Sequence, residues 1–225
     1  MTEGTAPRRE RAGFAVAGSL LVDRLHPISH YPRNGELCSV LAEATPATGG
    51  AACNVSLDLA RLAPDLPVHV LGVVGADENG AFIRAQLSKQ PNIDLTGVQT
   101  EGHTSYTLVM EDRSNRQRTF FSYQGANALF DETRIDWARL DAKLLHVGYA
   151  LILDRLDGPD QTYGTRMARL LHMAQERGTL TSLDTVSEAG PRMARLLPPA
   201  LRYTDYCVIN EFEAGQITGV PLLAD

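Results

Sequence analysis

The sequence predicts an α/β protein with a mostly parallel sheet, helices on both faces of that sheet and a small additional β-sheet. Nearly continuous apolar runs, typical of buried strands, alternate with amphipathic helical runs along most of the chain. Two segments instead alternate polar with β-branched or aromatic residues, a pattern typical of strands with one exposed face. With 225 residues, 44% of them hydrophobic, the chain is long enough to bury a sizeable core.

The composition argues against several classes of partner. An excess of 27 Asp and Glu over 21 Lys and Arg gives a net charge of −6, which argues against binding to a nucleic-acid backbone. The three cysteines and six histidines show no metal-ligand spacing. Residues 1–12 lack the apolar run of a signal peptide, and no apolar stretch is long enough to cross a bilayer. We therefore expect a short disordered tail, residues 1–12, and one α/β domain, residues 13–225, in a cytoplasmic protein without a membrane partner.

The first half of the chain opens with an apolar run over residues 13–23, which predicts a buried strand that ends at the carboxylate of Asp23. Three prolines interrupt the next segment, residues 24–48, and favour short exposed strands outside the main sheet. A helical period follows over residues 51–62, with Val55, Leu59 and Leu62 expected on its apolar face. A buried strand, a second helix and the two strands of a hairpin are then expected at residues 68–75, 78–90, 106–112 and 116–124.

The second half alternates helices and strands with little interruption. Its clearest helix ends at Gly178, a residue type that commonly terminates helices. Helices are expected at residues 131–141, 162–178, 188–198 and 211–219. The strands expected between them lie at residues 142–153, 179–185 and 203–210.

Ligands of open α/β sheets bind outside the carboxyl ends of the strands, and two candidate features lie there in the first half. The carboxylate of Asp23 can accept hydrogen bonds from ligand hydroxyls, although a turn or capping role is the alternative. Gly49 and Gly50 would let a ligand approach the backbone and the free N–H groups of a helix start. Asn54, which follows them, offers both a donor and an acceptor, whereas the alternative is an ordinary helix start.

Two further candidates lie at later junctions. Residues 125–127, Gly-Ala-Asn, follow the hairpin and are either a ligand contact or a turn. Asn210 and Glu213 lie where a strand meets a helix, and they either face phosphates and a hydrated Mg²⁺ or stabilise the helix dipole. The chain has no GxGxxG or GxxxxGK[ST] motif, which disfavours a nicotinamide-dependent dehydrogenase and excludes a P-loop protein. Residues 75–77, Gly-Ala-Asp, are assigned no catalytic role.

Taken in order, these segments resemble the PfkB family of carbohydrate kinases, which has the ribokinase-like fold. The order and separation of the motifs carry the resemblance, and it spans nearly the whole chain. The matching segments are GSLLVD, PRNGE, GGAACN, GVVGADENG, GAN and INEFEAGQITG, at residues 18–23, 32–36, 49–54, 72–80, 125–127 and 209–219.

The resemblance implies a Rossmann-like sheet that carries a sugar pocket and a small β-sheet lid. The lid strands, expected at about 24–48 and 103–124, would close over a sugar or nucleoside and could form a homodimer contact. Either Phe120 or Phe121 would cover the sugar ring, and we assign Phe121. The residues expected to bind substrate are Asp23, Gly49, Gly50, Asn54, Phe121, Asn127 and Tyr149, the last an aromatic near the position where some family members have a carboxylate, which would change the pocket wall.

The implied reaction is the transfer of a phosphoryl group from ATP to a hydroxyl of a sugar or related polyol, with ATP and Mg²⁺ as cofactors. Asn210 and Glu213 match the Asn-x-x-Glu motif of the phosphate and Mg²⁺ environment. Ribokinases have a polar residue at the position of Leu21 and a lysine at that of Ala51, so another sugar, a sugar acid or a nucleoside is favoured over ribose.

One family motif is absent from these 225 residues: the Gly-Ala-Gly-Asp turn whose aspartate is the general base. We therefore expect the chain to hold the sugar-side part of the fold, to contain no catalytic base and to phosphorylate nothing by itself. The alternative is a non-catalytic sugar-binding or dimerising module.

Overall fold

The computed structural model describes residues 11–188 and 190–220, so most of the expected N-terminal tail lies outside the described residues. Within the described part, seven strands form a central sheet in the order β13-β12-β9-β1-β4, with β5 and β6 both paired to β4. Every pairing in this sheet is parallel. The strands are β1 (Phe14–Gly18), β4 (Val68–Val74), β5 (Ile93–Asp94), β6 (Val98–Thr100), β9 (Leu144–Ala150), β12 (Leu180–Thr185) and β13 (Tyr206–Val208).

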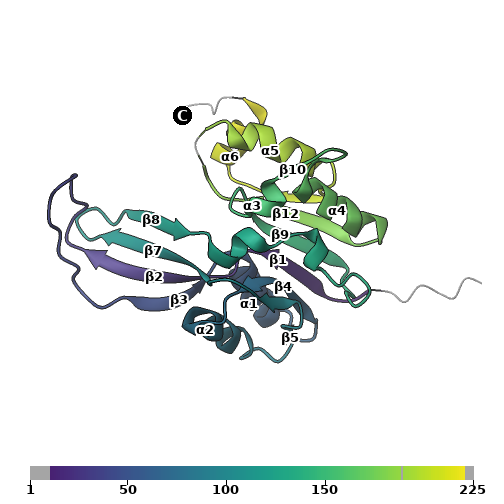
Figure 1. Cartoon of the computed structure of the whole chain (residues 1–225), viewed down its shortest axis with the longest axis horizontal. Helices are drawn as coiled ribbons and strands as arrows, with labels where there is room; N and C mark the ends of the chain where they lie inside the picture. Colours follow the sequence, from purple (N-terminus) through teal and green to yellow (C-terminus); the bar gives the residue numbers. More distant parts are fainter. Residues whose placement is uncertain (1–10, 189, 221–225) are drawn as a thin grey trace, which may run out of the picture.

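Helices cover both faces of the central sheet, which confirms the predicted α/β class (Figure 1). One face packs against α1 and α2, and the other packs mainly against α4 and α5. Two short 3-10 helices, η1 and η2, precede β9. The helices are α1 (Ala51–Leu62), α2 (Glu78–Leu87), η1 (Gly125–Leu129), η2 (Glu132–Arg134), α3 (Asp154–Asp157), α4 (Arg166–Glu176), α5 (Arg192–Leu201) and α6 (Glu211–Thr218), and a two-residue pair, β10 (Pro159–Asp160) and β11 (Gly164–Thr165), precedes α4.

A second sheet, which we call the small sheet, extends from one end of the central sheet (Figure 1). Among the described residues it has four strands in the order β3-β2-β7-β8. The central β2–β7 pair is parallel, and β3 and β8 are antiparallel to their neighbours. Its strands are β2 (Leu21–Ile28), β3 (Thr45–Gly49), β7 (Ser105–Asp112) and β8 (Arg118–Tyr123), and β7 with β8 is the expected hairpin.

The expected single strand over residues 13–23 is instead two strands that belong to different sheets. The chain leaves the central sheet after Gly18, whose φ of +122° favours glycine, and enters the small sheet at Leu21. Asp23 is therefore not at the end of a central strand but inside β2, opposite Thr107 of β7. A continuous apolar run does not reveal this change of sheet, because both strands bury their side chains there.

Two backbone N–H groups find acceptors at the junction between the two strands, residues Ser19 and Leu20. Both residues are fully buried. The Ser19 N–H donates to the carbonyl of Gly148 in β9 at 2.8 Å, and the Leu20 N–H donates to Oδ1 of Asn127 at 2.9 Å. Because buried N–H groups need acceptors, these bonds hold the end of β1, the start of β2 and η1 together.

Two helical expectations are corrected. The helix expected over residues 131–141 is reduced to η2, because Asp131 and Asp136 accept hydrogen bonds from nearby backbone N–H groups, and such local bonds compete with a helix. In α1 the bounds agree with the expectation, but Leu62 is 83% exposed. The buried positions of α1 are Ala51, Ala52, Cys53, Ser56 and Ala60.

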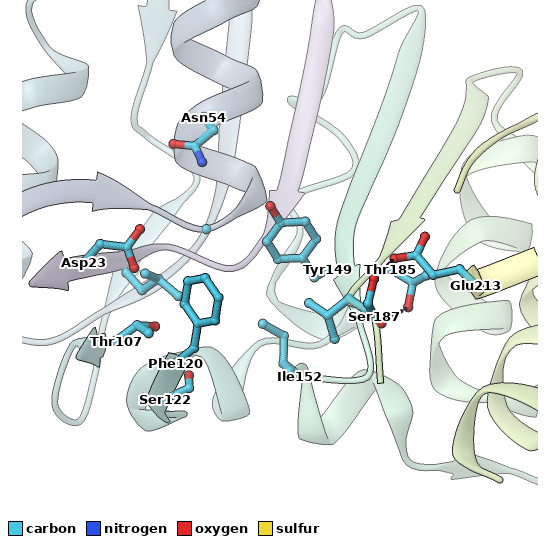
Figure 2. A pocket seen from close by; sticks show the side chains of 13 residues that line it. Asp23, Asn54, Thr107, Phe120, Ser122, Tyr149, Ile152, Thr185, Ser187 and Glu213 are labelled. Atoms are coloured by element: carbon cyan, nitrogen blue, oxygen red, sulfur yellow. Dashed lines mark hydrogen bonds between the residues drawn. The ribbon is translucent and has the colours of Figure 1, made fainter. Parts of the chain in front are cut away.

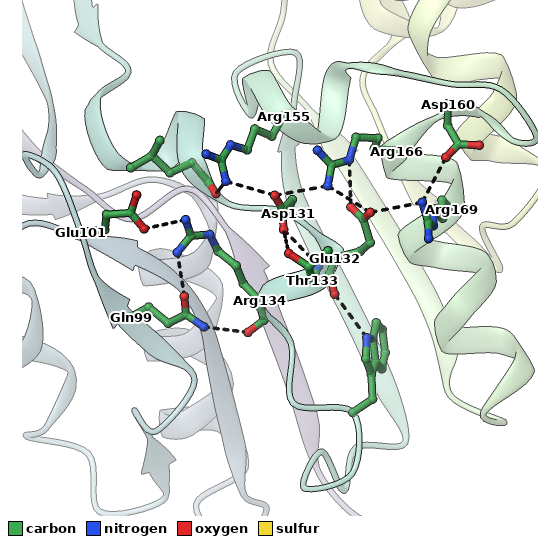
Figure 3. A network of polar contacts seen from close by, with 12 residues as sticks. Gln99, Glu101, Asp131, Glu132, Thr133, Arg134, Arg155, Asp160, Arg166 and Arg169 are labelled. Atoms are coloured by element: carbon green, nitrogen blue, oxygen red, sulfur yellow. Dashed lines mark hydrogen bonds and ion pairs between the residues drawn. The ribbon is translucent and has the colours of Figure 1, made fainter.

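A network of buried charges joins η2 to the helices that follow β9 (Figure 3). The carboxylates of Asp131 and Glu132 are almost fully buried. Arg155 and Arg166 each lie 3.2 Å from Asp131, and Arg166 also donates two hydrogen bonds to Glu132 at 3.1 and 3.2 Å. Paired in this way, the two carboxylates avoid the large cost of an isolated buried charge and anchor the segment before β9 to α4.

The loop after β9, residues 151–153, is held by one carboxylate. The N–H groups of Leu151 and Leu153 donate to the two oxygens of Asp157 at 3.1 and 3.0 Å. Burial raises the pKa of Asp157 to about 6, although these two hydrogen bonds lower it. The position of this loop therefore depends on a titratable group.

We predict that Asn127→Ala destabilises the protein by about 1–3 kcal/mol, because the buried Leu20 N–H loses its acceptor. Urea denaturation of the two proteins measures this difference. Asn34→Ala, at an exposed position, is the matched control and should change stability little. Equal stability of Asn127→Ala and the unmodified protein would mean that the junction does not depend on this bond.

We also predict a pH-dependent effect of Asp157→Asn. The folded-state pKa of about 6 lies above the ordinary value of 3.8, so the stabilisation from Asp157 is greatest near pH 4 and is lost as the pH rises through 6. The stability of the unmodified protein relative to the variant should thus fall by about 1–3 kcal/mol between pH 4 and pH 7. Urea denaturation at both pH values tests this, with Asp65→Asn, at an exposed position, as control. A difference that does not vary with pH would contradict the prediction.

Candidate functional site

A cavity of about 550 Å³ lies where the small sheet meets the carboxyl ends of β9 and β12 (Figure 2). Its volume is in the range of small-molecule sites. One side is formed by the small sheet and the start of α1, and the other by β9, the segment after β12 and α6. The lining residues are Leu21, Asp23, Gly50, Asn54, Thr107, Phe120, Ser122, Tyr149, Ile152, Thr185, Val186, Ser187 and Glu213.

Asp23 reaches the cavity from β2. Burial raises the pKa of its carboxyl group, and a hydrogen bond with the hydroxyl of Thr107 partly offsets that effect. The ionised carboxylate offers only acceptors, so it is suited to ligand hydroxyls. The structure thus places Asp23 at the cavity, as expected, but on the small sheet.

The two glycines before α1 make room for other parts of the protein. A Cβ atom on Gly49 would lie 2.3 Å from Oδ2 of Asp23. Gly50 has a φ of +82°, and a Cβ atom there would lie 2.4 Å from the carbonyl oxygen of Ser19. Both positions therefore require glycine so that Asp23 and the strand junction can approach α1. Gly50 lines the cavity, whereas Gly49 lies behind Asp23.

The expectation that α1 presents free N–H groups to a ligand is wrong for its first two residues. The Ala51 N–H donates to Oγ of Ser19 at 3.0 Å, and the Ala52 N–H donates to the Ser19 carbonyl at 3.1 Å. The buried serine thus occupies the donors that a ligand would have used. From α1, the exposed side chain of Asn54 reaches the cavity instead.

Tyr149 stands at the end of β9, between the two sides of the cavity (Figure 2). Burial raises the pKa of its phenol, and the carboxylates of Asp184, Asp23 and Glu213 raise it further. The phenol therefore stays protonated and can donate a hydrogen bond at neutral pH. Its place in the cavity agrees with the expectation.

Phe120 lines the cavity and Phe121 does not, which corrects the assignment of Phe121. Successive side chains of a strand point to opposite faces of the sheet. Phe120 lies opposite Val109, and Ser122, the next residue on the same face, lies opposite Thr107, which is the partner of Asp23. Phe121 belongs to the other face of the small sheet.

Asn127 is also corrected, because it is not a lining residue but part of the buried frame. Its side chain is almost fully buried and accepts from the Leu20 N–H, and its own N–H donates to Oγ of Ser105 at 3.0 Å. The Gly-Ala-Asn segment thus holds the two sheets together rather than facing the cavity.

Asn210 and Glu213 form a capping box at the start of α6. Oδ1 of Asn210 accepts from the Glu213 N–H at 2.9 Å, and Oε2 of Glu213 accepts from the Asn210 N–H at 3.1 Å. The hydroxyl of Ser187 donates to Oε1 of Glu213 at 2.7 Å. These bonds fix the carboxylate of Glu213 at the cavity wall, so capping and ligand contact are compatible roles.

Several lining residues carried no signal in the sequence motifs. Thr107 and Ser122 could have been inferred from strand alternation only if the register between β2, β7 and β8 had been known. Ile152 and Ser187 lie in the segments that follow β9 and β12, and these segments contain no recognisable sequence motif.

Two absences concern the described residues. They include no group of three or more His, Cys, Asp or Glu side chains that could hold a metal ion. None of the helices in residues 11–188 and 190–220 is long and apolar enough to cross a membrane.

Comparison with solved structures places the fold among the ribokinase-like proteins. A ribokinase from Arabidopsis thaliana, solved with ribose and ATP, is 22% identical, with a TM-score of 0.71, and the match covers 95% of this chain and 65% of that one. A fructokinase from Xylella fastidiosa with bound ATP is 21% identical, with a TM-score of 0.64, and the match covers 88% and 60%. A nucleoside kinase from Methanocaldococcus jannaschii is 16% identical, with a TM-score of 0.68, and the match covers 93% and 64%.

At these identities the likeness shows the fold alone, and this chain covers less than two thirds of each of those structures. No curated protein sequence matches the chain. The family model of the pfkB family carbohydrate kinases matches residues 18–225. The chain therefore belongs to the PfkB family of carbohydrate kinases.

Proposed function

We propose that this chain carries the sugar-binding part of a kinase that transfers the γ-phosphoryl group of ATP to a hydroxyl of a sugar or related small polyol. The observation that supports this proposal is the convergence of Asp23, Asn54 and Thr107 on one end of a cavity whose other end holds Glu213. Hydroxyl recognition and a phosphate environment would then lie in the same space (Figure 2).

At the small-sheet end, the three polar side chains match the hydrogen-bonding needs of a polyol. Asp23 accepts, Asn54 both donates and accepts, and the Thr107 hydroxyl does either. Phe120 can cover the C–H face of a sugar ring, because it lies on the same face of the small sheet as Thr107 and Ser122. Binding and orientation of the acceptor hydroxyl in this way are a large part of phosphoryl-transfer catalysis.

At the α6 end, Glu213 and Asn210 suit a hydrated Mg²⁺ and phosphates. Each carboxylate oxygen of Glu213 already accepts one hydrogen bond, and each keeps a lone pair that can accept another from a metal-bound water. A single carboxylate is consistent with Mg²⁺, which retains several waters and is bound largely through the phosphates of its nucleotide. When bound, the ion would neutralise charge on the transferred phosphoryl group.

We predict that Asp23→Ala weakens sugar binding by about ten- to a hundredfold, since a hydrogen bond to a charged group contributes about 1.5–3 kcal/mol. Titration calorimetry or ligand-detected NMR with a panel of sugars measures the loss. Asp58→Ala, an exposed carboxylate on α1, is the control and should bind as the unmodified protein does. If Asp23→Ala bound sugars as tightly as the unmodified protein does, this cavity would not be the sugar-binding site.

We also predict no sugar-dependent release of ADP from a protein made of these 225 residues, because they contain no Gly-Ala-Gly-Asp turn. A coupled ADP assay with Mg²⁺ and ATP, run with a sugar shown to bind, measures this. ADP release that requires the sugar and disappears in Asp23→Ala would contradict the prediction and would mean that another residue of this chain is the base.

A further inference from the structure

We propose that the cavity accepts an uncharged substrate, a neutral sugar or nucleoside, and rejects sugar acids and sugar phosphates. This inference rests on the proposed function and narrows its substrate class. It follows from the charges of the lining residues. Among the described residues, the lining includes two carboxylates, Asp23 and Glu213, one at each end of the cavity, and no lysine, arginine or histidine.

Neither carboxylate is neutralised by a cation. Within the described part of the chain, the partners of Glu213 are the Ser187 hydroxyl and the Asn210 N–H, both uncharged. The carboxyl group of Asp23 bonds the Thr107 hydroxyl. In the absence of the Mg²⁺ proposed for Glu213, the ionised forms of the two groups therefore present negative charge to a ligand.

The arginines nearest in sequence to the lining residues have other partners. Arg24 follows Asp23 in β2, so it points to the other face of the small sheet, where it donates to Asn79 at 2.9 Å. Arg118 lies two residues before Phe120 in β8 and therefore on the same face of the small sheet, but its guanidinium pairs with Glu111, its neighbour on β7, at 3.7 Å. Neither arginine is among the residues that line the cavity, where a guanidinium could bind a carboxylate or phosphate through two hydrogen bonds.

A further arginine lies close to the loop that carries Ile152. Arg192 pairs with Glu188 at 2.7 Å and donates to the Leu151 carbonyl at 3.0 Å. Its guanidinium thus holds the outside of the loop, and it is not among the residues that line the cavity.

A charged substrate would meet repulsion in a site that partly excludes water. Like charges a few ångströms apart at an effective dielectric constant of about 20 repel each other strongly enough to reduce affinity by more than tenfold. A neutral polyol is attracted rather than repelled, because its hydroxyls donate hydrogen bonds to the same carboxylates. Between the two ends lie Phe120, Ile152 and Tyr149 (Figure 2), whose apolar surfaces suit the C–H face of a sugar or a base.

The test compares ligands that share a carbon skeleton and differ in charge. Suitable pairs are ribose with ribose 5-phosphate, fructose with fructose 6-phosphate, glucose with glucuronate, and uridine with its 5′-monophosphate. Ligand-detected NMR of the 225-residue chain, with competition between the members of each pair, measures the relative affinities. We expect at least one neutral member to bind and its anionic counterpart to bind at least about tenfold more weakly.

An anionic member that binds as tightly as its neutral counterpart, or more tightly, would overturn the inference and leave the proposed function intact. If no ligand of either kind competes for the cavity, the proposed function fails, and the inference fails with it. The two failures are therefore distinguishable.

Isosteric variants separate charge from shape. Asp23→Asn and Glu213→Gln remove one charge each with little change in volume, and glutamine also suits a capping box. In at least one of them the preference for the neutral ligand should shrink about tenfold, whereas Asp58→Asn, on the exposed side of α1, should keep it. Circular dichroism of each variant confirms folding. A preference that persists unchanged in both folded variants would assign the selectivity to shape and overturn the charge mechanism.

Discussion

The structure depends on the point where the chain passes from the central sheet into the small sheet. Ser19 is buried there and has three backbone or side-chain bonds to other elements: its N–H to β9, its Oγ to the Ala51 N–H and its carbonyl to the Ala52 N–H. The next residue, Leu20, is held by Asn127. Because each of these polar groups is buried, each bond avoids the cost of an unsatisfied donor or acceptor, and together they fix β1, β2, β9, α1 and η1 in one arrangement.

The candidate site follows from that junction. β2 carries Asp23 three residues beyond Leu20, α1 starts beside the junction and presents Asn54, and the end of β9 next to it carries Tyr149. Gly49 and Gly50 are required because Asp23 and Ser19 approach them too closely for a Cβ atom. A candidate ligand site thus lies where the two sheets diverge. The backbone groups at that point are hydrogen-bonded within the protein, whereas the side chains beyond it remain available to contact a ligand.

The electrostatic character of the site has two physical origins, burial and helix capping. Burial raises the pKa values of Asp23 and Tyr149, and at the other end the capping box holds the carboxylate of Glu213 in place. The result is a cavity with acceptors at both ends, a neutral phenol between them and, in the part of the chain that the structure describes, no basic side chain in its wall. Membership of the PfkB family, together with a fold shared with longer kinases, gives this arrangement its functional context.

Local sequence was sufficient to predict the fold class, the bounds of α1, the β7–β8 hairpin and the family, because hydrophobic periodicity follows burial and the motifs occur in order. It also indicated Asp23, Asn54, Tyr149 and Glu213 as site residues, and all four line the cavity. Tertiary structure decided the change of sheet after Gly18, the choice of Phe120 over Phe121 and the structural role of Asn127. Each of these depends on pairing between distant segments, such as the 107 residues that separate Leu20 from Asn127, and local sequence carries no record of such partners.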